Sequence, residues 1–171
     1  MQNKQEKFLR LIRHPLKFRL FLLAKLPAAF FSGVRVSSID ESSATVTVPF
    51  KWFSQNPFKS TYFACLAMAA EMTTGLLGLM HIYKREPAVS MLVVGLEAKY
   101  FKKATGITTF TCEDGDIINI LIEEAIHTGE SRSIRARSTG TNTHGELVAE
   151  FFITWSFKTK GKATQKSENN F

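Results

Sequence analysis

The sequence contains little cysteine and no grouped metal ligands. Its two cysteines, Cys65 and Cys112, lie in apolar runs, and two cysteines cannot build a disulfide framework. The four histidines are scattered along the chain: His14, His81, His127 and His144. Because structural metal sites need such ligands at short spacings, we expect no metal site and two reduced core cysteines.

Cofactor motifs and a secretory signal are also missing. No Gly-rich phosphate loop, dinucleotide fingerprint or internal repeat interrupts the chain. The apolar run Leu20–Ala24 is short, and Lys25 and Pro27 interrupt it, so it does not resemble a signal peptide. We therefore expect a cytoplasmic protein without a resident cofactor.

Acidic side chains are nearly absent from the first 35 residues. This segment holds one acid, Glu6, and eight basic side chains: Lys4, Lys7, Arg10, Arg13, Lys17, Arg19, Lys25 and Arg35. The net charge of +7 therefore belongs to this segment, and residues 36–171 balance at 14 of each sign. Such a segment can meet ligand phosphates or an anionic membrane, or it can be a solvated helix face. Nucleic-acid binding is not expected, because the rest of the chain is neutral and carries no recognition motif.

The remaining pattern predicts one α+β domain. Apolar residues at helical spacing (Phe8, Leu11, Ile12, Leu16, Leu20, Leu23) predict two N-terminal helices, with a corner at Pro15 and an end at Pro27. Alternating runs predict a hairpin over 34–50 and strands near 90–100, 106–113, 131–139 and 146–158. Residues 117–126 are predicted as mixed strand and helix. We expect basic helices over 1–27 packed on a single domain over 28–160, and a disordered tail over 161–171.

One run, Ser60–Met80, is apolar or small almost throughout and holds a single charge, Glu71. A helix that is hydrophobic all round must be buried in a bilayer or at the centre of a fold. We favour the second, with Ser60 or Thr61 as N-cap, because a carboxylate at mid-bilayer is expensive. A buried carboxylate needs a partner, a proton or a function. Glu71 is thus the first candidate for chemistry, and pairing with Lys99 or Arg135 is the structural alternative.

An antiparallel sheet around one long helix, entered after a hairpin, resembles the hotdog fold. Hotdog thioesterases similar to the phenylacetyl-CoA type carry Asn in a loop, His-Gly-Gly opening the helix, and an acid nine positions after the His. Here Asn56 stands in the loop, Tyr62-Phe63-Ala64 opens the helix, and Glu71 follows Tyr62 by nine. The basic N-terminal helices, Leu26-Pro27, Gly33 and the Trp155 strand look like a branch known mainly as a domain of unknown function and taken for thioesterases.

The resemblance implies hydrolysis of a medium-chain, long-chain or aryl acyl-CoA. Glu71 would be the base or nucleophile, and the N–H groups of Phe63 or Ala64 would hold the oxyanion. Asn56 would orient water or the thioester, helped by Thr74. Turn capping by Asn56, and a Thr74 hydroxyl bonded to its own helix, are the structural alternatives.

The spacing indicates a homodimer, or a dimer of dimers. Glu71 lies about 13 Å along the helix from Tyr62, so it is expected to serve a partner's helix N-terminus. Candidate cations for CoA phosphates are Lys102, Lys103, Arg135 and Arg137. Candidate acyl contacts are Trp52, Phe58 and Tyr62. Exposed charges and core aromatics explain the same residues.

The sequence departs from the thioesterase pattern at two places. Tyr-Phe-Ala replaces His-Gly-Gly, and Gly75 stands where a Thr often follows the acid. These departures favour a second function, a hotdog dimer that binds an acyl chain or lipid without cleaving it. Its basic helices would contact anionic membranes. Hydration of enoyl thioesters is not expected, because no suitably placed His accompanies an acid.

Overall fold

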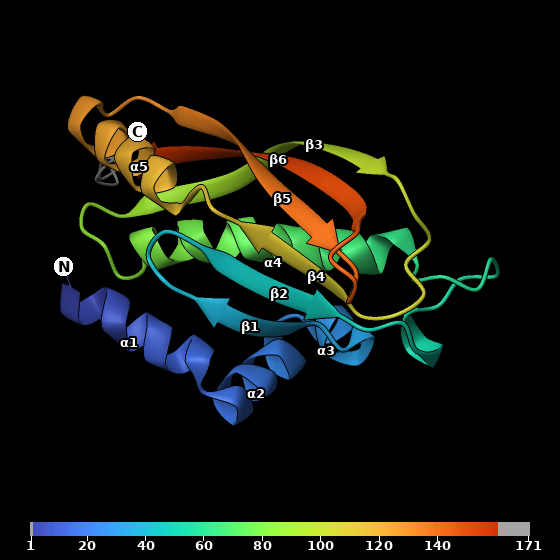
Figure 1. Ribbon diagram of the computed structural model, residues 1–171. Coiled ribbons are helices and arrows are strands. Elements are labelled where there is room, and N and C mark those ends of the chain that lie inside the picture. Colours follow the sequence, from blue (N-terminus) through green and yellow to red (C-terminus); the bar gives the residue numbers. More distant parts are fainter. Residues whose placement is uncertain (1, 161–171) are drawn as a thin grey trace, which may run out of the picture.

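The computed structural model describes residues 2–160 (Figure 1). The N-terminal elements are α1 (Gln2–Arg13), α2 (Pro15–Lys25), α3 (Pro27–Ser32), β1 (Arg35–Ile39) and β2 (Ala44–Val48). A 3-10 turn, η1 (Trp52–Ser54), precedes the long helix α4 (Phe63–Ile82). The chain continues through β3 (Val89–Tyr100), β4 (Thr108–Cys112), α5 (Gly115–Thr128), β5 (Arg132–Thr141) and β6 (Leu147–Thr159). The predicted disordered tail lies outside the described residues.

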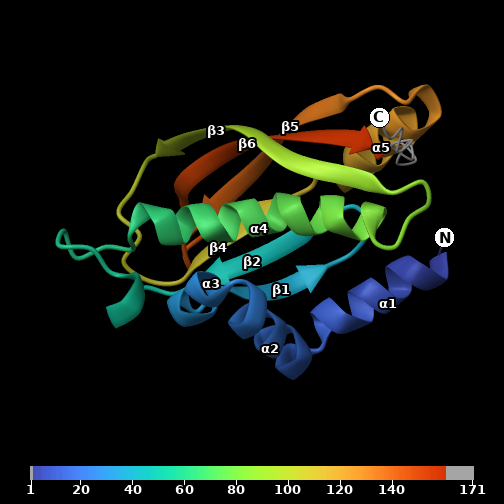
Figure 2. The same cartoon turned by 180° about the vertical axis from the view of Figure 1, so that it is seen from behind.

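The strands of residues 2–160 form one antiparallel sheet in the order β1-β2-β4-β5-β6-β3. The sheet curves over α4, with α5 at one end (Figure 1). Figure 2 shows the other side, where α4 lies uncovered between β3 and the N-terminal helices. The predicted class, an α+β fold with a sheet wrapped round one long helix, is confirmed.

The core lies between α4 and the inner face of the sheet. On β6, alternate side chains such as Phe151, Ile153 and Phe157 are fully buried. Each such side chain contributes roughly 2 kcal/mol through burial. α4 is long and apolar enough to cross a membrane by length and composition, yet two thirds of its most apolar window is buried inside the fold. Cys65 and Cys112 are buried, as predicted, and burial raises the pKa of the Cys112 thiol to about 12.

The N-terminal helices follow the prediction except after Pro27. Pro15 occupies the first turn of α2, and the His14 side chain caps that helix. Pro27 was expected only to end the second helix, but it also begins the short helix α3. Proline suits both places, because it cannot continue a helix and its fixed φ suits a first helical turn. α3 then ends at Gly33, whose φ of +80° favours glycine.

The predicted N-cap of α4 is wrong, since α4 begins at Phe63 with Tyr62 as N-cap. The hydroxyl of Ser60 donates to Asn56 Oδ1, and that of Thr61 donates to the Ala104 carbonyl at 3.1 Å. Both hydroxyls are therefore committed to loop contacts. These contacts reach outside the helix, so local helix signals could not reveal them.

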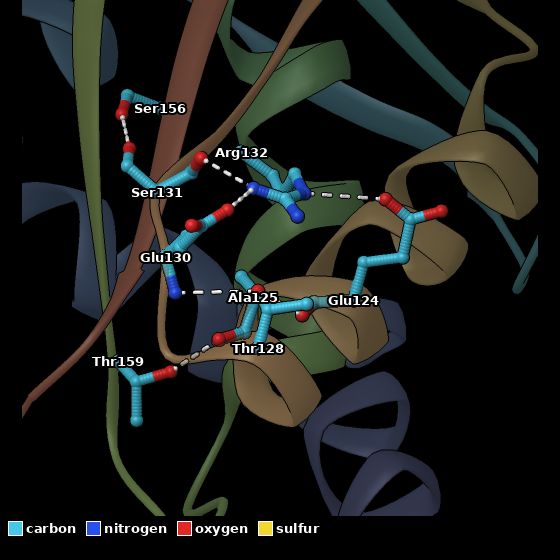
Figure 3. Close-up of polar contacts among 8 residues, drawn as sticks. All are labelled: Glu124, Ala125, Thr128, Glu130, Ser131, Arg132, Ser156 and Thr159. Carbon is cyan, nitrogen blue, oxygen red and sulfur yellow. Dashed lines mark hydrogen bonds and ion pairs between the residues drawn. The ribbon is translucent and has the colours of Figure 1, made fainter.

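The predicted mixed segment is entirely helical, as α5. Ile118, Ile122 and Ala125 are buried at helical spacing, and Gly129 ends the helix as predicted. Polar contacts fix its C-terminal end to the sheet (Figure 3). Thr159 Oγ1 donates to the Ala125 carbonyl at 2.8 Å, and Arg132 pairs with Glu124 and Glu130.

Candidate functional site

A cleft of about 590 Å³ opens at the N-terminal end of α4. Its walls come from the loop before α4, the first turns of α4 and the segment after β3. It brings together six predicted site residues: Asn56, Phe58, Tyr62, Phe63, Lys102 and Lys103. Leu66, Tyr100 and Phe101 also line it, and sequence reasoning missed them. The only signal for them was their apolar character, which most core residues share.

Backbone donors stand free at this end of α4. Tyr62 caps the helix without a side-chain hydrogen bond, and its carbonyl accepts first from the Cys65 N–H, at 2.9 Å. The N–H groups of Phe63 and Ala64 therefore have no acceptor among residues 2–160. Free donors and the positive end of the helix dipole favour an anion. The role of these two N–H groups as oxyanion donors stays a prediction.

The amide oxygen of Asn56 is occupied by hydrogen bonds within its own loop. Its Oδ1 accepts from the Phe58 N–H at 3.0 Å and from the Ser60 hydroxyl at 3.2 Å, so it holds the loop 56–60 in shape. This is the predicted turn-capping alternative. The Nδ2 group makes no hydrogen bond within the described part of the chain, and it remains a donor for a ligand in the cleft.

The two lysines stand at the rim of the cleft. Lys102 pairs with Glu146, whereas Lys103 Nζ donates to the Phe58 carbonyl at 3.4 Å. Lys103 has no carboxylate partner among residues 2–160, so its charge is available to a phosphate.

Glu71 lies outside this cleft, in the middle of α4. Its side chain is half-buried, and its carboxylate forms no hydrogen bond or ion pair within residues 2–160. Neither predicted alternative partner meets it, since Arg135 pairs with Glu97 and Lys99 lies over the Phe152 ring. Burial raises the pKa of Glu71 above its ordinary value.

Trp155 and Gly75 shape the surroundings of this acid. A side chain placed on Gly75 would meet Glu71 Oε1 at 3.1 Å and Trp155 Cζ2 at 3.3 Å. Gly75 therefore leaves the space that the carboxylate and the indole edge share. Sequence reasoning noted Gly75 only as a missing Thr, although the inward alternation of β6 could have placed Trp155 next to α4.

Thr74 has the structural role that was predicted as the alternative to catalysis, a hydroxyl bonded to its own helix. Its buried hydroxyl donates to the Glu71 carbonyl at 3.0 Å and accepts from Trp155 Nε1 at 2.8 Å. It therefore holds the indole beside Glu71. The structure does not bring it to Asn56, which lines the cleft.

The acid faces an apolar strip at the edge of the sheet. On β3, Val93 pairs with Trp155 and Leu96 with Ile153, so both lie on the inner face. They are nevertheless 38% and 53% exposed. The surroundings of Glu71 thus combine an unpaired carboxylate with exposed apolar side chains at the sheet edge.

Three predicted ligand contacts lie elsewhere. Arg135 stacks over Phe152 and Arg137 pairs with Glu150, both on the outer face of the sheet. Trp52 is 82% exposed on η1 and does not line the cleft. Their roles in binding CoA stay predictions. Within residues 2–160, no cluster of three or more His, Cys, Asp or Glu could hold a metal ion.

Residues 17–157 match the model of a family described as Domain of unknown function (DUF4442). The chain belongs to this family. The predicted membership of a branch known mainly as a domain of unknown function is thereby confirmed. No curated protein matches the DUF4442 chain significantly.

Solved structures share the fold of this DUF4442 protein. A probable thioesterase of unknown function from Pseudomonas aeruginosa, PA5026, superposes with a TM-score of 0.71 at 20% identity, covering 88% of this chain and 99% of that one. A protein of unknown function from Chlorobaculum tepidum gives 0.70 at 17% identity, covering 85% and 94%. Thioesterase HI1161 from Haemophilus influenzae gives 0.60 at 14% identity, covering 85% and 92%. The predicted hotdog fold of thioesterase-like proteins is confirmed.

Proposed function

We propose that the protein is a thioesterase that hydrolyses acyl-CoA, with each site shared between two copies of the chain. The observation that carries the proposal is Glu71, an unpaired acid with a raised pKa, open to an apolar surface. Perturbed acids in such places are characteristic of catalytic sites. The free N–H groups of Phe63 and Ala64 supply the other half of the chemistry.

The distance along α4 requires a second copy. Glu71 lies about 12 Å along the helix from Phe63, by the rise per residue, so its carboxylate does not reach the donors of its own chain. The edge strand β3 offers a way to join two copies. It is 12 residues long and carries exposed Leu92, Val94 and Leu96. Pairing of two such edges would extend the sheet and cover the apolar strip beside each Glu71.

The proposed reaction proceeds in two steps. The thioester carbonyl oxygen accepts hydrogen bonds from the Phe63 and Ala64 N–H groups of one copy. Glu71 of the other copy takes a proton from water, and the resulting hydroxide adds to the carbonyl carbon. The oxyanion then collapses, the C–S bond breaks, and the CoA thiolate receives the proton from Glu71.

The cleft supplies the binding contacts in this scheme. Lys103, with Lys102, meets the CoA phosphates. The apolar lining, including Phe58 and Leu66, receives the acyl chain. Raising the pKa of Glu71 brings the acid closer to the operating pH, which makes it a better general base.

Thiol release from an acyl-CoA panel tests the proposal. Glu71→Gln should lower kcat by roughly a thousandfold or more while ligand binding persists, because it removes the base and keeps the shape. Glu113→Gln, at an exposed acid, is the matched control and should retain full activity. Equal rates for the wild type and Glu71→Gln would discard the mechanism.

Mixing two inactive variants tests the shared site. Phe63→Pro removes one backbone donor, and proline is tolerated at the first helical position. Co-refolded with Glu71→Gln, it should recover about one quarter of the wild-type rate, because random pairing leaves one intact site in half of the dimers. No recovery, with mixed dimers demonstrated, would contradict the two-copy site.

A second candidate is an acyl-binding dimer without turnover. It is favoured by Tyr62-Phe63-Ala64 at the helix start, where a thioesterase of the resembled type has glycines that admit the carbonyl. The Tyr62 and Phe63 rings pack at 4.8 Å between centroids and line the cleft. Saturable binding of acyl-CoA by calorimetry, with no thiol released, would favour this candidate.

A further inference from the structure

We propose that α2, α3 and η1 form a docking face for anionic lipid membranes. The docking face consists of Leu16, Leu20, Leu23, Phe31, Trp52 and Phe53. The proposal concerns where the protein resides, and it holds whether or not the cleft cleaves thioesters.

The outward side of α2 is apolar. α2 buries Phe18 and Leu22, whereas Leu16, Leu20 and Leu23 are 65%, 57% and 42% exposed. At 100° per residue these three leucines fall within about 60° of one another, roughly opposite the buried pair. A helix on the surface of a protein surrounded by water normally carries polar residues there. α2 therefore packs one apolar side against the fold and exposes a second apolar side on the surface.

A second group of exposed apolar side chains lies on α3 and η1. Phe31 contacts Phe53 with 5.7 Å between ring centroids, and Phe53 contacts Trp52 at 6.4 Å. Phe31 is 50% exposed and Trp52 is 82% exposed. α2, α3 and η1 lie together on the lower side of the molecule in both views (Figures 1 and 2). Tryptophan at such a position is typical of a membrane–water interface.

The charge around the docking face indicates which kind of partner it binds. Residues 7–39 contain seven basic side chains and no acid. Lys17 and Lys25 are exposed on α2, and neither meets a carboxylate within residues 2–160. A second copy of the chain would bring two basic faces together, which like-charge repulsion opposes. Exposed leucines, with Lys17 at the edge of their face and no acid in the segment, instead match the acyl boundary and the headgroups of an anionic bilayer.

Helix α5 provides an internal contrast. Its Ile117 and Ile120 are 52% and 56% exposed, similar to the α2 leucines. Acids accompany them: Asp116, Glu123 and Glu124. Exposed apolar residues on α5 therefore lack the cationic setting, and α5 is the matched control surface.

The position of the docking face also concerns the cleft. Trp52 and Phe58 belong to the same loop before α4, and Phe58 lines the cleft. Docking through Trp52 therefore brings the rim of the cleft near the bilayer, a source of acyl ligands.

Vesicle sedimentation of the full chain tests the proposal, with phosphatidylcholine vesicles with and without phosphatidylglycerol. Wild type should bind the anionic vesicles at low salt and lose affinity at high salt. Leu16→Ser with Leu20→Ser should weaken binding by roughly tenfold or more, through lost apolar contact. Lys17→Glu with Lys25→Glu should weaken it similarly. Ile117→Ser with Ile120→Ser should leave it unchanged, and circular dichroism checks that each variant is folded.

Fluorescence provides a readout that does not depend on those variants. Trp52 emission should shift to the blue and be quenched by brominated lipid, and Trp52→Phe should remove this response. Binding that needs the lysines but not the leucines would overturn the proposal in favour of charge attraction alone. Equal binding by wild type and both double variants on α2, or no binding to anionic vesicles at low salt, would also overturn it.

Discussion

The two halves of the candidate site, at the start and in the middle of α4, differ in how their polar side chains are satisfied. In the cleft, Asn56, Lys102 and Lys103 all make hydrogen bonds or ion pairs with their own chain. Around Glu71, the carboxylate has none within residues 2–160, and its neighbours are apolar and uncovered. The cleft is thus shaped by one chain, whereas the proposed dimer would complete the surroundings of the acid.

The largest effect is expected at the β3 edge. Leu92→Lys with Val94→Lys places like charges opposite each other if two β3 edges pair. The dimer should dissociate and thioester hydrolysis should fall by roughly a thousandfold, since neither copy can supply both halves. Light scattering and a thiol-release assay measure the two results. Ile117→Lys with Ile120→Lys on α5 is the control and should leave both measurements unchanged. Loss of the dimer without loss of activity would show that Glu71 does not need a partner chain.

The next effect concerns the helix start alone. Phe63→Pro removes one backbone donor, and Tyr62 already has the extended conformation that a following proline needs. We expect kcat to fall by roughly a hundredfold, as for loss of one oxyanion donor. Phe63→Ala removes the same ring but keeps the N–H group, so it should retain most of kcat. Similar rates for the two variants would show that the N–H group is not used.

A Thr74 variant distinguishes a structural role of this hydroxyl from a catalytic one. Thr74→Val leaves the buried Trp155 N–H without an acceptor, which should lower the free energy of unfolding by about 2 kcal/mol. Urea denaturation measures this loss. The activity per folded molecule should change little, because the hydroxyl is bonded to the fold; a large fall in kcat would restore Thr74 to the chemistry.

Lys103 tests the cleft as the CoA site. Lys103→Ala should raise KM for acyl-CoA by roughly tenfold with kcat nearly unchanged, because it removes a phosphate contact that is also present before reaction. Steady-state kinetics measure both constants. The exposed Lys158→Ala, on β6, is the control and should change neither.

The smallest effect is the pH dependence of stability. Burial raises the pKa of Glu71, so the folded state holds its proton more tightly than the unfolded state does. Glu71 therefore costs nothing below its ordinary pKa of 4.5 and destabilises the fold as the pH rises through the raised value. Glu71→Gln should stabilise the protein by about 1 kcal/mol at pH 8, and the gain should vanish near pH 4. Denaturation at several pH values measures it.

The fold, and the position of Glu71 in a largely buried helix, could be predicted because each depends on local patterns. A single charge in an apolar helical run is visible in the sequence, and so is the alternation of β5, which puts Arg135 and Arg137 on the same face of the strand. Whether that face is inner or outer depends on how the sheet wraps, which alternation does not reveal. The N-cap of α4 was mispredicted for a related reason, because the Thr61 hydroxyl bonds to Ala104, 43 residues away.

Within the site, the sequence showed which residues to consider better than it showed which of them lie next to one another. Six of the cleft residues were predicted, from the resemblance and from the chemistry that an acyl-CoA needs, and the structure assembles them. The bond between Thr74 and Trp155 on a distant strand was not predicted, because helical spacing cannot show a partner elsewhere in the sequence. The role of Gly75 as shared space also needed the structure, since an absent side chain has no signal of its own.

The packing of Trp155 against Glu71 gives the protein a built-in optical probe. The sequence has two tryptophans, and the other one, Trp52, lies on the exposed surface. A Trp52→Phe variant would emit from Trp155 alone, whose ring edge shares the space at Gly75 with the carboxylate. Ionisation of that acid, or arrival of an acyl group beside it, would then alter the emission, so occupancy could be followed in real time without a label.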